Sequence, residues 1–251
     1  MSAESTEPVR PAGDGHDLDF YAHLRTHYDA IFPLDRARPE FLLTLVRGRR
    51  GFLDLGCATA TLCDSLTVDF EAVEGWDLDA GFLEIARRRC LHMPNLLLEQ
   101  RDLREVGRSR FRADLVSCLG NTLVHLDSPD AIRSVLRGMR RALHGEGAAV
   151  VQTVNYDALE SLDHEFPAIE REGLRFERTY RARPDGKVDF VTRLETAEGC
   201  SQAATVLLPL GAEALQELAR EAGFGSITLR GGFSRRAWNR TSPATVAVLR
   251  R

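Results

Sequence analysis

"FLDLGCATAT", residues Phe52–Thr61, is the stretch that decides the fold. Its first four residues are mostly apolar, and the rest are small: one glycine, one cysteine, two alanines and two threonines. This pattern is typical of a strand that turns into a helix, whose first N–H groups can meet a ligand. A dinucleotide-binding turn would carry three glycines in G-x-G-x-x-G, whereas Gly56 is the only glycine here. The stretch therefore predicts a ligand-binding turn and disfavours a dinucleotide.

The surrounding segments alternate between strand-like and helix-like patterns. The apolar runs that predict strands cover residues 51–55, 70–77, 95–100, 112–120 and 147–154. Helical spacing of apolar residues occurs at 20–32, 38–48, 59–67, 80–91 and 128–143. A helix at 212–224 and strands at 226–232 and 244–251 end the chain. The sequence thus predicts an α/β fold with a doubly wound, mostly parallel, seven-stranded Rossmann-like sheet.

One segment interrupts this alternation and has the pattern of an antiparallel insert. Residues 174–210 alternate apolar and polar positions on both sides of the hairpin turn Pro184-Asp185-Gly186. We expect about three antiparallel strands here, within a substrate lid that spans 156–210. The cofactor-binding domain then comprises 20–155 and 211–251. Residues 1–19 are poor in apolar residues and are expected to form a disordered tail.

Composition argues against several classes of function. Charged residues make up 28% of the 251 residues and the formal net charge is −4, so we expect no nucleic-acid partner. No secretory pattern begins the sequence and no apolar run reaches the ~18 residues of a membrane span, which predicts a cytoplasmic protein without membrane contact. The five cysteines are scattered without a C-x-x-C pair, which argues against a metal site. Whether the chain forms a homo-oligomer is left open.

Two carboxylates follow the strands that neighbour the turn. Asp77 ends the second predicted strand about 20 residues after Gly56, where a carboxylate can accept both hydroxyls of a ribose. Asp77 could instead cap the next helix, unless Asp79 does so. Asp102 follows the third strand and can accept a hydrogen bond from an adenine amino group, while Leu103 offers its backbone N–H. Together these features describe an adenosine pocket without a diphosphate.

Three stretches resemble the class I S-adenosylmethionine-dependent methyltransferases. "DLGCATA" (Asp54–Ala60) is similar to their D-x-G-C-G-T-G motif, "WDLDAGFLEIARRR" to their second motif, and "DLVSCLGNTLVHL" to their fourth strand and following loop. Two of the family's glycines are Ala58 and Ala60 here, so we expect φ < 0 at both positions or a cofactor that sits slightly outward. The resemblance implies S-adenosylmethionine as cofactor and S-adenosylhomocysteine as product. It implies that the cofactor is bound by Tyr28, Asp54, Gly56, Cys57, Ala58, Asp77, Leu78, Asp102, Leu103, Leu119 and Gly120.

Two further stretches resemble the glycine N-methyltransferase branch and its small-molecule relatives. "CLGNTLVHL" (Cys118–Leu126) is similar to the branch's C-L-G-N-S-x-x-H-L, and "VNYD" (Val154–Asp157) to its R-N-Y-D. In the branch that arginine holds the substrate carboxylate, and its replacement by Val154 disfavours glycine as substrate. The substrate residues we expect are Tyr21, Asn121, Asn155, Tyr156 and Arg178. Asn121 and His125 are the catalytic candidates.

The favoured function is methyl transfer to a small molecule, with a nitrogen acceptor preferred. A hydroxyl acceptor would need a base, for which His125 is the best-placed candidate. The unusual turn leaves open a reaction at another sulfonium carbon, either aminocarboxypropyl transfer or a cyclisation that releases methylthioadenosine. A non-catalytic subunit that binds the cofactor is the third hypothesis.

Overall fold

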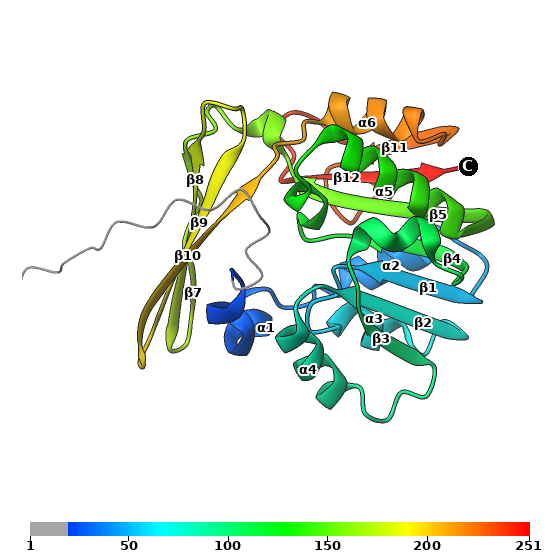
Figure 1. The fold of residues 1–251 in the computed structure, drawn as a ribbon, viewed down its shortest axis with the longest axis horizontal. Coiled ribbons are helices and arrows are strands. Elements are labelled where there is room, and N and C mark those ends of the chain that lie inside the picture. The colour runs from blue at the N-terminus through cyan, green and yellow to red at the C-terminus, as the bar shows by residue number, and fades with distance from the viewer. Residues whose placement is uncertain (1–19) are drawn as a thin grey trace, which may run out of the picture.

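The computed structural model of the protein describes residues 20–251, which form two sheets and the helices around them (Figure 1). The tail predicted for residues 1–19 lies outside the described residues. In Figure 1 the second sheet stands beside one end of the main sheet, and the short N-terminal helix α1 lies between the two. Within residues 20–251, no helix is long and apolar enough to cross a membrane.

The main sheet has seven strands in the order β11-β12-β5-β4-β1-β2-β3. Their bounds are β1 (Gly51–Leu55), β2 (Ala72–Asp77), β3 (Leu96–Gln100), β4 (Ala113–Cys118), β5 (Leu143–Val154), β11 (Ser226–Arg230) and β12 (Ala244–Arg250). The first five run parallel, while β12 is antiparallel to both β5 and β11. This confirms the doubly wound, mostly parallel seven-stranded sheet. The strand order reverses between β1 and β4, and ligands of such sheets bind at the carboxyl ends beside this point.

Strand β1 shows why helices cover both faces of this sheet. Phe52 packs in one apolar cluster with Leu42 and Leu83, whereas Leu53 packs in another with Leu136 and Leu215. Successive side chains of a strand point to opposite faces, so a fully apolar strand needs cover on both. The helices that supply it are α2 (Ala37–Thr44), α3 (Thr61–Leu66), α4 (Ala80–Arg89), α5 (Pro129–Ala142) and α6 (Ala212–Glu221). The expected helix at 38–48 ends earlier, at Thr44.

The second sheet is antiparallel and has more strands than the sequence indicates. It comprises β6 (His164–Glu165), β7 (Ile169–Arg171), β8 (Leu174–Ala182), β9 (Val188–Thr196) and β10 (Gly199–Leu207). The three long strands match the expected pattern, and Gly186 occupies the turn with a φ of 79°. The expectation of about three strands within 174–210 is confirmed. The sheet gains β6 and β7 from the residues before 174, and at two and three residues these are too short to show an alternation.

The N-terminal element packs between the two sheets. It begins as a 3₁₀ helix, η1 (Ala22–His27), and continues as α1 (Tyr28–Ile31), where the sequence predicts one helix over 20–32. Leu24 and Ile31 are buried against Phe176 and Leu194 of the second sheet. Further 3₁₀ helices follow the strands: η2 (Leu103–Arg108), η3 (Thr122–His125) and η4 (Tyr156–Ala158). The carboxyl ends of the central strands therefore face a wall made by the element and the second sheet.

Candidate active site

The turn after β1 is held to the end of β2 by backbone hydrogen bonds. The N–H groups of Gly56 and Cys57 both donate to the Trp76 carbonyl, at 2.8 and 2.9 Å. Gly56, Ala58 and Ala60 have φ values of 79°, 47° and 58°. The expectation of φ < 0 at the two alanines is therefore wrong. The turn keeps the left-handed geometry that suits glycine, and each alanine carries a strain of roughly 1–2 kcal/mol.

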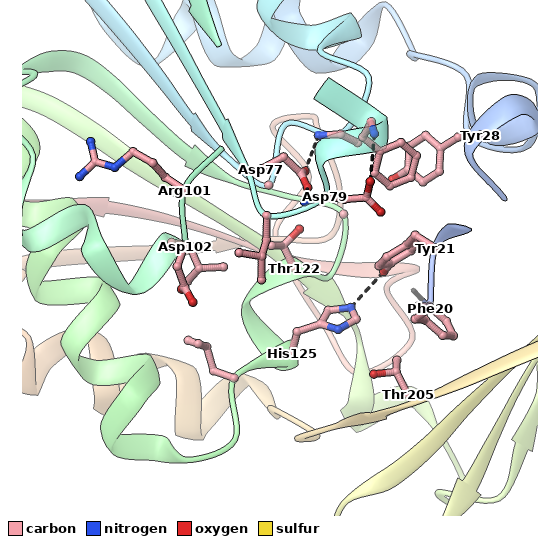
Figure 2. Close-up of a pocket in the computed structure, with 17 residues that line it drawn as sticks. Phe20, Tyr21, Tyr28, Asp77, Asp79, Arg101, Asp102, Thr122, His125 and Thr205 are labelled. Atoms are coloured by element: carbon pink, nitrogen blue, oxygen red, sulfur yellow. Dashed lines mark hydrogen bonds between the residues drawn. The ribbon is translucent and has the colours of Figure 1, made fainter. Parts of the chain in front are cut away.

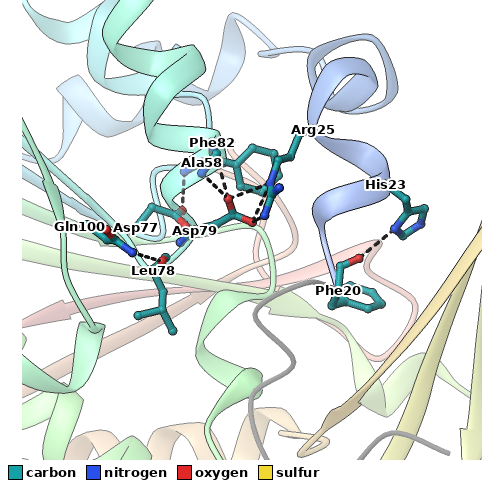
Figure 3. A network of polar contacts seen from close by, with 10 residues as sticks. Phe20, His23, Arg25, Ala58, Asp77, Leu78, Asp79, Phe82 and Gln100 are labelled. Carbon is teal, nitrogen blue, oxygen red and sulfur yellow. Dashed lines mark hydrogen bonds and ion pairs between the residues drawn. The ribbon is translucent and has the colours of Figure 1, made fainter. Parts of the chain in front are cut away.

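Asp77 ties this turn to the loop after β2 (Figure 3). Its Oδ2 accepts the Ala58 N–H at 2.7 Å, and its Oδ1 accepts the Asp79 N–H at 2.9 Å. Burial raises the pKa of the Asp77 carboxyl to about 6, because a charged group loses hydration inside the protein. The carboxylate thus links two loops while it faces the cavity described below.

The alternative role for Asp77, capping α4, falls to Asp79 (Figure 3). The Asp79 carboxylate accepts the N–H groups of Gly81 and Phe82 at 2.8 and 3.0 Å. The same carboxylate pairs with the Arg25 guanidinium through bonds of 2.9 Å to each oxygen. This bidentate pair fastens the N-terminal element over the start of α4.

Asp77 and Asp102 open onto the same cavity, of about 130 Å³ (Figure 2). Asp102 caps η2, since its Oδ1 accepts the Arg104 N–H at 2.8 Å. The cavity is also lined by the predicted cofactor residues Tyr28, Gly56, Ala58, Leu78, Leu103 and Gly120. Arg101 and Phe82 line it too, and neither is predicted from the sequence. The two carboxylates at neighbouring strand ends therefore meet as the adenosine hypothesis requires.

A second cavity, of about 300 Å³, continues from the first toward the antiparallel sheet. The two share Tyr21, Tyr28, Gly56, Ala58, Gly120, Thr122 and His125. Asp54, Cys57 and Leu119, the remaining predicted cofactor residues, line the second cavity together with Arg38. Asp54 is buried and accepts the Ser117 hydroxyl at 2.6 Å, and burial raises the pKa of its carboxyl to about 6. Every predicted cofactor residue thus lines one of two adjoining cavities.

Tyr21 and His125 meet where the cavities join (Figure 2). The Tyr21 hydroxyl lies 3.0 Å from His125 Nε2. Burial raises the pKa of the Tyr21 hydroxyl well above its usual value, with the Tyr28 hydroxyl adding to the shift. Tyr21 is therefore neutral and keeps its proton. A histidine with a hydroxyl partner, at the border of both cavities, can orient an acceptor or remove its proton.

Asn121 connects β5 to Tyr156 of η4 and to Tyr180 of the second sheet. Its backbone has a φ of 68°, and its Oδ1 accepts the Val154 N–H at 3.0 Å. Its Nδ2 lies 3.4 Å from the Tyr156 hydroxyl and 3.3 Å from the Tyr180 hydroxyl. Tyr180 lines the second cavity, while Tyr156 is outside both linings and stacks on Tyr180 at 5.8 Å between ring centroids. Tyr156 thus supports the cavity wall from behind.

Asn155 does not lie in the predicted substrate site. It is buried, and its Nδ2 donates to the backbone carbonyl of Ser242 at 2.9 Å. It lines neither cavity. The amide is used to hold the loop before β12, so the structure gives Asn155 a role in the fold.

Several cavity residues have no signal in the sequence, whereas Phe176 and Tyr180 share the alternation of the predicted Arg178. Arg38, Thr122 and Gln152 enter the second cavity from three different elements, which no local pattern reports. Phe176, Arg178 and Tyr180 share its wall because they alternate along β8. A period of two in "LRFERTYRA" separates this inward set from the outward Arg175, Glu177 and Arg181.

Comparison with known proteins gives the class of this fold. Residues 52–147 match a family model described as a methyltransferase domain. A methyltransferase from Streptomyces caelestis is 20% identical, with a TM-score of 0.78 over 95% of this chain and 98% of that one. A sugar N-methyltransferase from Streptoalloteichus is 22% identical, with a TM-score of 0.65 over 100% and 99%. Residues 52–147 therefore resemble a methyltransferase domain, and the described chain has the fold of these solved methyltransferases.

Two curated relatives match part of the chain. A dTDP-4-amino-2,3,4,6-tetradeoxy-D-glucose N,N-dimethyltransferase from Saccharopolyspora spinosa is 30% identical over 44% of this chain and 45% of its own length. A dTDP-3-amino-3,6-dideoxy-alpha-D-glucopyranose N,N-dimethyltransferase from Streptomyces fradiae is 31% identical over 40% of this chain and 38% of its own length. Each match spans less than half of the relative.

Proposed function

We propose that this protein transfers a methyl group from S-adenosylmethionine to a small molecule, and that the acceptor atom is an amine nitrogen. The observation that carries the proposal is one site made of two adjoining cavities. The first cavity is lined by Asp77 and Asp102 beside the small-residue turn. The second cavity reaches the antiparallel second sheet, which we take as the lid over the acceptor. The two curated relatives are both amino-sugar N,N-dimethyltransferases, which supports nitrogen as the acceptor.

The residues of the first cavity fit an adenosine. A Cβ added to Gly120 would meet no atom within 4 Å, so the chain leaves open space there. Asp77 presents a carboxylate for ribose hydroxyls, and Asp102 presents one for an adenine amino group. Arg38 lines the adjoining cavity, and its Nε is shielded from solvent without a hydrogen-bond partner among the described residues. A buried donor of this kind suits the carboxylate of the methionine part.

Chemistry at this site needs little from the protein beyond position. S-adenosylmethionine supplies a methyl group on a positively charged sulfur, which makes the methyl carbon electrophilic. Tyr21, His125 and Gly120 stand at the junction of the cavities and would hold the acceptor against that carbon. Alignment alone is worth about 7–11 kcal/mol when two reactants are held in one site. The amine must be neutral, and the apolar wall around Phe176 and Phe190 lowers the pKa of a buried amine in that direction.

A hydroxyl acceptor is the second candidate, and one contact favours it. His125 Nε2 lies 3.0 Å from the Tyr21 hydroxyl, which gives the histidine a polar partner at the reacting junction. A general base there could take the proton of an alcohol or phenol. An amine needs no such base in the transition state, so the two candidates differ in how far they depend on His125.

Calorimetry with S-adenosylhomocysteine, followed by product analysis, tests the proposal. We expect saturable one-to-one binding, and release of S-adenosylhomocysteine only when an amine acceptor is present. A panel of amino sugars, amino acids and phenols, read by mass spectrometry for a gain of one methyl group, identifies the acceptor atom. Absence of binding by either cofactor form, or release of methylthioadenosine from S-adenosylmethionine alone, would contradict the proposal.

A further inference from the structure

The inward face of β8 carries one cation among aromatic side chains. Phe176, Arg178 and Tyr180 all line the second cavity, while Phe166 and Phe190 complete the wall around them. On the outward face of the same strand, Arg175 pairs with Glu177 at 2.8 Å. The arginines of β8 are therefore not equivalent, and Arg178 is the one directed at the proposed acceptor.

Arg178 is partly buried and has no acidic partner among residues 20–251. Its Nε is shielded from solvent and has no hydrogen-bond partner in the part of the chain that the structure describes. Its Nη2 makes one long hydrogen bond, of 3.4 Å, to the Pro167 carbonyl, and the guanidinium lies 5.1 Å from the Phe166 ring centroid. Among the ion pairs found within residues 20–251, none includes Arg178. Burial lowers the pKa of the guanidinium, because its charge has lost part of its hydration.

The neighbours of Arg178 could share an anion with it. Thr192 lies opposite Arg178 in the β8–β9 register and lines the same cavity. The Thr192 hydroxyl is 3.2 Å from Nε2 of His23, and the Thr192 side chain is almost fully buried. His23 is not among the residues that line the cavity and contacts the Thr192 hydroxyl from outside it. The guanidinium fork and the hydroxyl, which share the wall, are groups that bind carboxylates and phosphates.

We propose that the acceptor is an amine that also carries an oxyanion, a carboxylate or a phosphate, and that Arg178 binds this oxyanion. The inference rests on the proposed function, since it assigns the lid cavity to the acceptor. Tyr180, which contacts Asn121, lies two residues from Arg178 along β8, on the same face of the strand. Two residues of a strand span about 7 Å, so an oxyanion bound at Arg178 would lie roughly that far from the contact between Tyr180 and Asn121. The resembled branch has a substrate-binding arginine at the position of Val154, at the end of β5. Arg178 would supply the corresponding positive charge from the second sheet.

The test measures binding of matched probes to the protein loaded with S-adenosylhomocysteine, in phosphate-free buffer. One pair is glucosamine and glucosamine phosphate, and the other is aminobutanol and aminobutyrate. We expect at least one anionic probe to bind about tenfold or more tightly than its neutral partner by calorimetry. In R178Q this preference should be lost, with the anionic probe weakened about 30-fold or more, as expected when one member of a buried charge pair is removed.

The matched control is R181Q on the same strand. Arg181 faces outward, is exposed, and pairs with Glu165 at 3.4 Å, so this variant should keep the anion preference. R178K retains the charge without the planar fork and should keep part of the preference. Circular dichroism and S-adenosylhomocysteine binding report whether each variant is folded. If R178Q does not fold, the anion preference of R178K is compared with that of the wild type. A preference as large as in the wild type would then overturn the inference.

The outcomes separate this inference from the proposed function. Equal binding of anionic and neutral probes by the loaded protein, no binding by either anionic probe, or an unchanged preference in R178Q and R178K would overturn the inference. Preference for the phosphate or for the carboxylate identifies the kind of oxyanion. Failure of the wild type to bind S-adenosylhomocysteine would instead remove the proposed function.

Discussion

The two ends of the site treat charge in opposite ways. At the sheet end, Asp77, Asp79 and Asp102 each accept backbone N–H groups, so their positions are set by the loops that they join. At the lid end, which the second sheet forms, the Arg178 guanidinium has one long hydrogen bond within residues 20–251, and its Nε has no partner there. The carboxylates at the sheet end find hydrogen-bond donors within the protein itself. The guanidinium at the lid end has a positive charge that a bound anion would pair.

This difference follows from the kind of sheet that builds each end. Parallel strands bring their carboxyl ends to one edge, where turns and helix starts offer many N–H groups to a carboxylate. The second sheet is antiparallel, and the backbone groups of its strands are used in the ladder. It therefore offers the cavity only the side chains of one face. Beyond its long hydrogen bond to the Pro167 carbonyl, the Arg178 guanidinium therefore needs an acidic side chain or an anionic ligand to pair its charge.

Replacement of Asp77 by alanine tests whether this carboxylate holds both the loops and the cofactor at the sheet end. It should have the largest effect. The Ala58 and Asp79 N–H groups would lose their acceptor, and the ribose would lose its carboxylate. We expect S-adenosylhomocysteine affinity to fall about 100-fold or more, and the free energy of unfolding to fall by about 1–3 kcal/mol. Calorimetry and denaturant unfolding measure the two effects.

D77N is the informative partner of D77A. Asparagine keeps an oxygen that can accept the Ala58 N–H, so most of the stability should return. The affinity should stay low, because the charged acceptor for both ribose hydroxyls is gone. Wild-type affinity in D77N would show that the carboxylate acts only within the protein, and the contrast between the two ends would then be wrong.

The sequence predicts the sheet end better than the lid end, and residue spacing explains why. Gly56, Asp77 and Asp102 each follow a strand whose apolar run is visible, and the parallel sheet brings these strand ends together. Arg38 and the contact between Tyr21 and His125 depend on how distant elements pack, and no local pattern reports that. The N-Y-D match suggests a substrate role for Asn155, but its amide holds a loop that lies far along the chain.

Acidification should sharpen the comparison by weakening the sheet end alone. The pKa of Asp77 is raised to about 6, so its carboxyl is charged above that pH and protonated below it. Ribose hydroxyls donate to the charged form, and S-adenosylhomocysteine affinity should therefore be flat above pH 7 and about tenfold weaker at pH 5. Calorimetry across this range measures the change, and D77N should lack it.

Stability should respond to the same titration with the opposite sign. The unfolded pKa of an aspartate is about 4, so between roughly pH 6 and 4 the folded protein binds more protons than the unfolded chain. The contribution of Asp77 and Asp54 to the free energy of unfolding therefore rises as the pH falls through this window. A loss of affinity that accompanies a loss of stability would point to acid unfolding and contradict this account.

Substitution of His125 tests the junction between the two ends. For an amine acceptor, H125Q should lower kcat/KM only a few-fold, up to about tenfold, because no proton is removed in the transition state. A hydroxyl acceptor would lose about 10²–10⁴-fold. The measurement uses the acceptor found in the product screen, and Y21F serves as the companion because it removes only the hydroxyl that contacts His125. A large loss in H125Q with an amine would assign the histidine a role in proton transfer.

The smallest expected effect comes from the strained turn itself, through A58G. Ala58 has a φ of 47°, and relief of this strain should gain about 1–2 kcal/mol, while the added freedom of glycine in the unfolded chain costs about 0.4–1 kcal/mol. The net gain in the free energy of unfolding should be about 0.5–1 kcal/mol.

Two control variants accompany A58G. A60G should gain less, because the Ala60 methyl is fully buried and its loss costs about 0.8 kcal/mol. A80G, in the first turn of α4, should destabilise by up to ~1 kcal/mol, since it brings the same entropy without any strain to relieve. Denaturant unfolding of the three variants measures the order A58G, A60G, A80G, and a destabilised A58G would mean that the turn does not adopt the left-handed geometry. The sheet end would then have accepted its alanines without strain, and its resemblance to a glycine-rich turn would be one of sequence only.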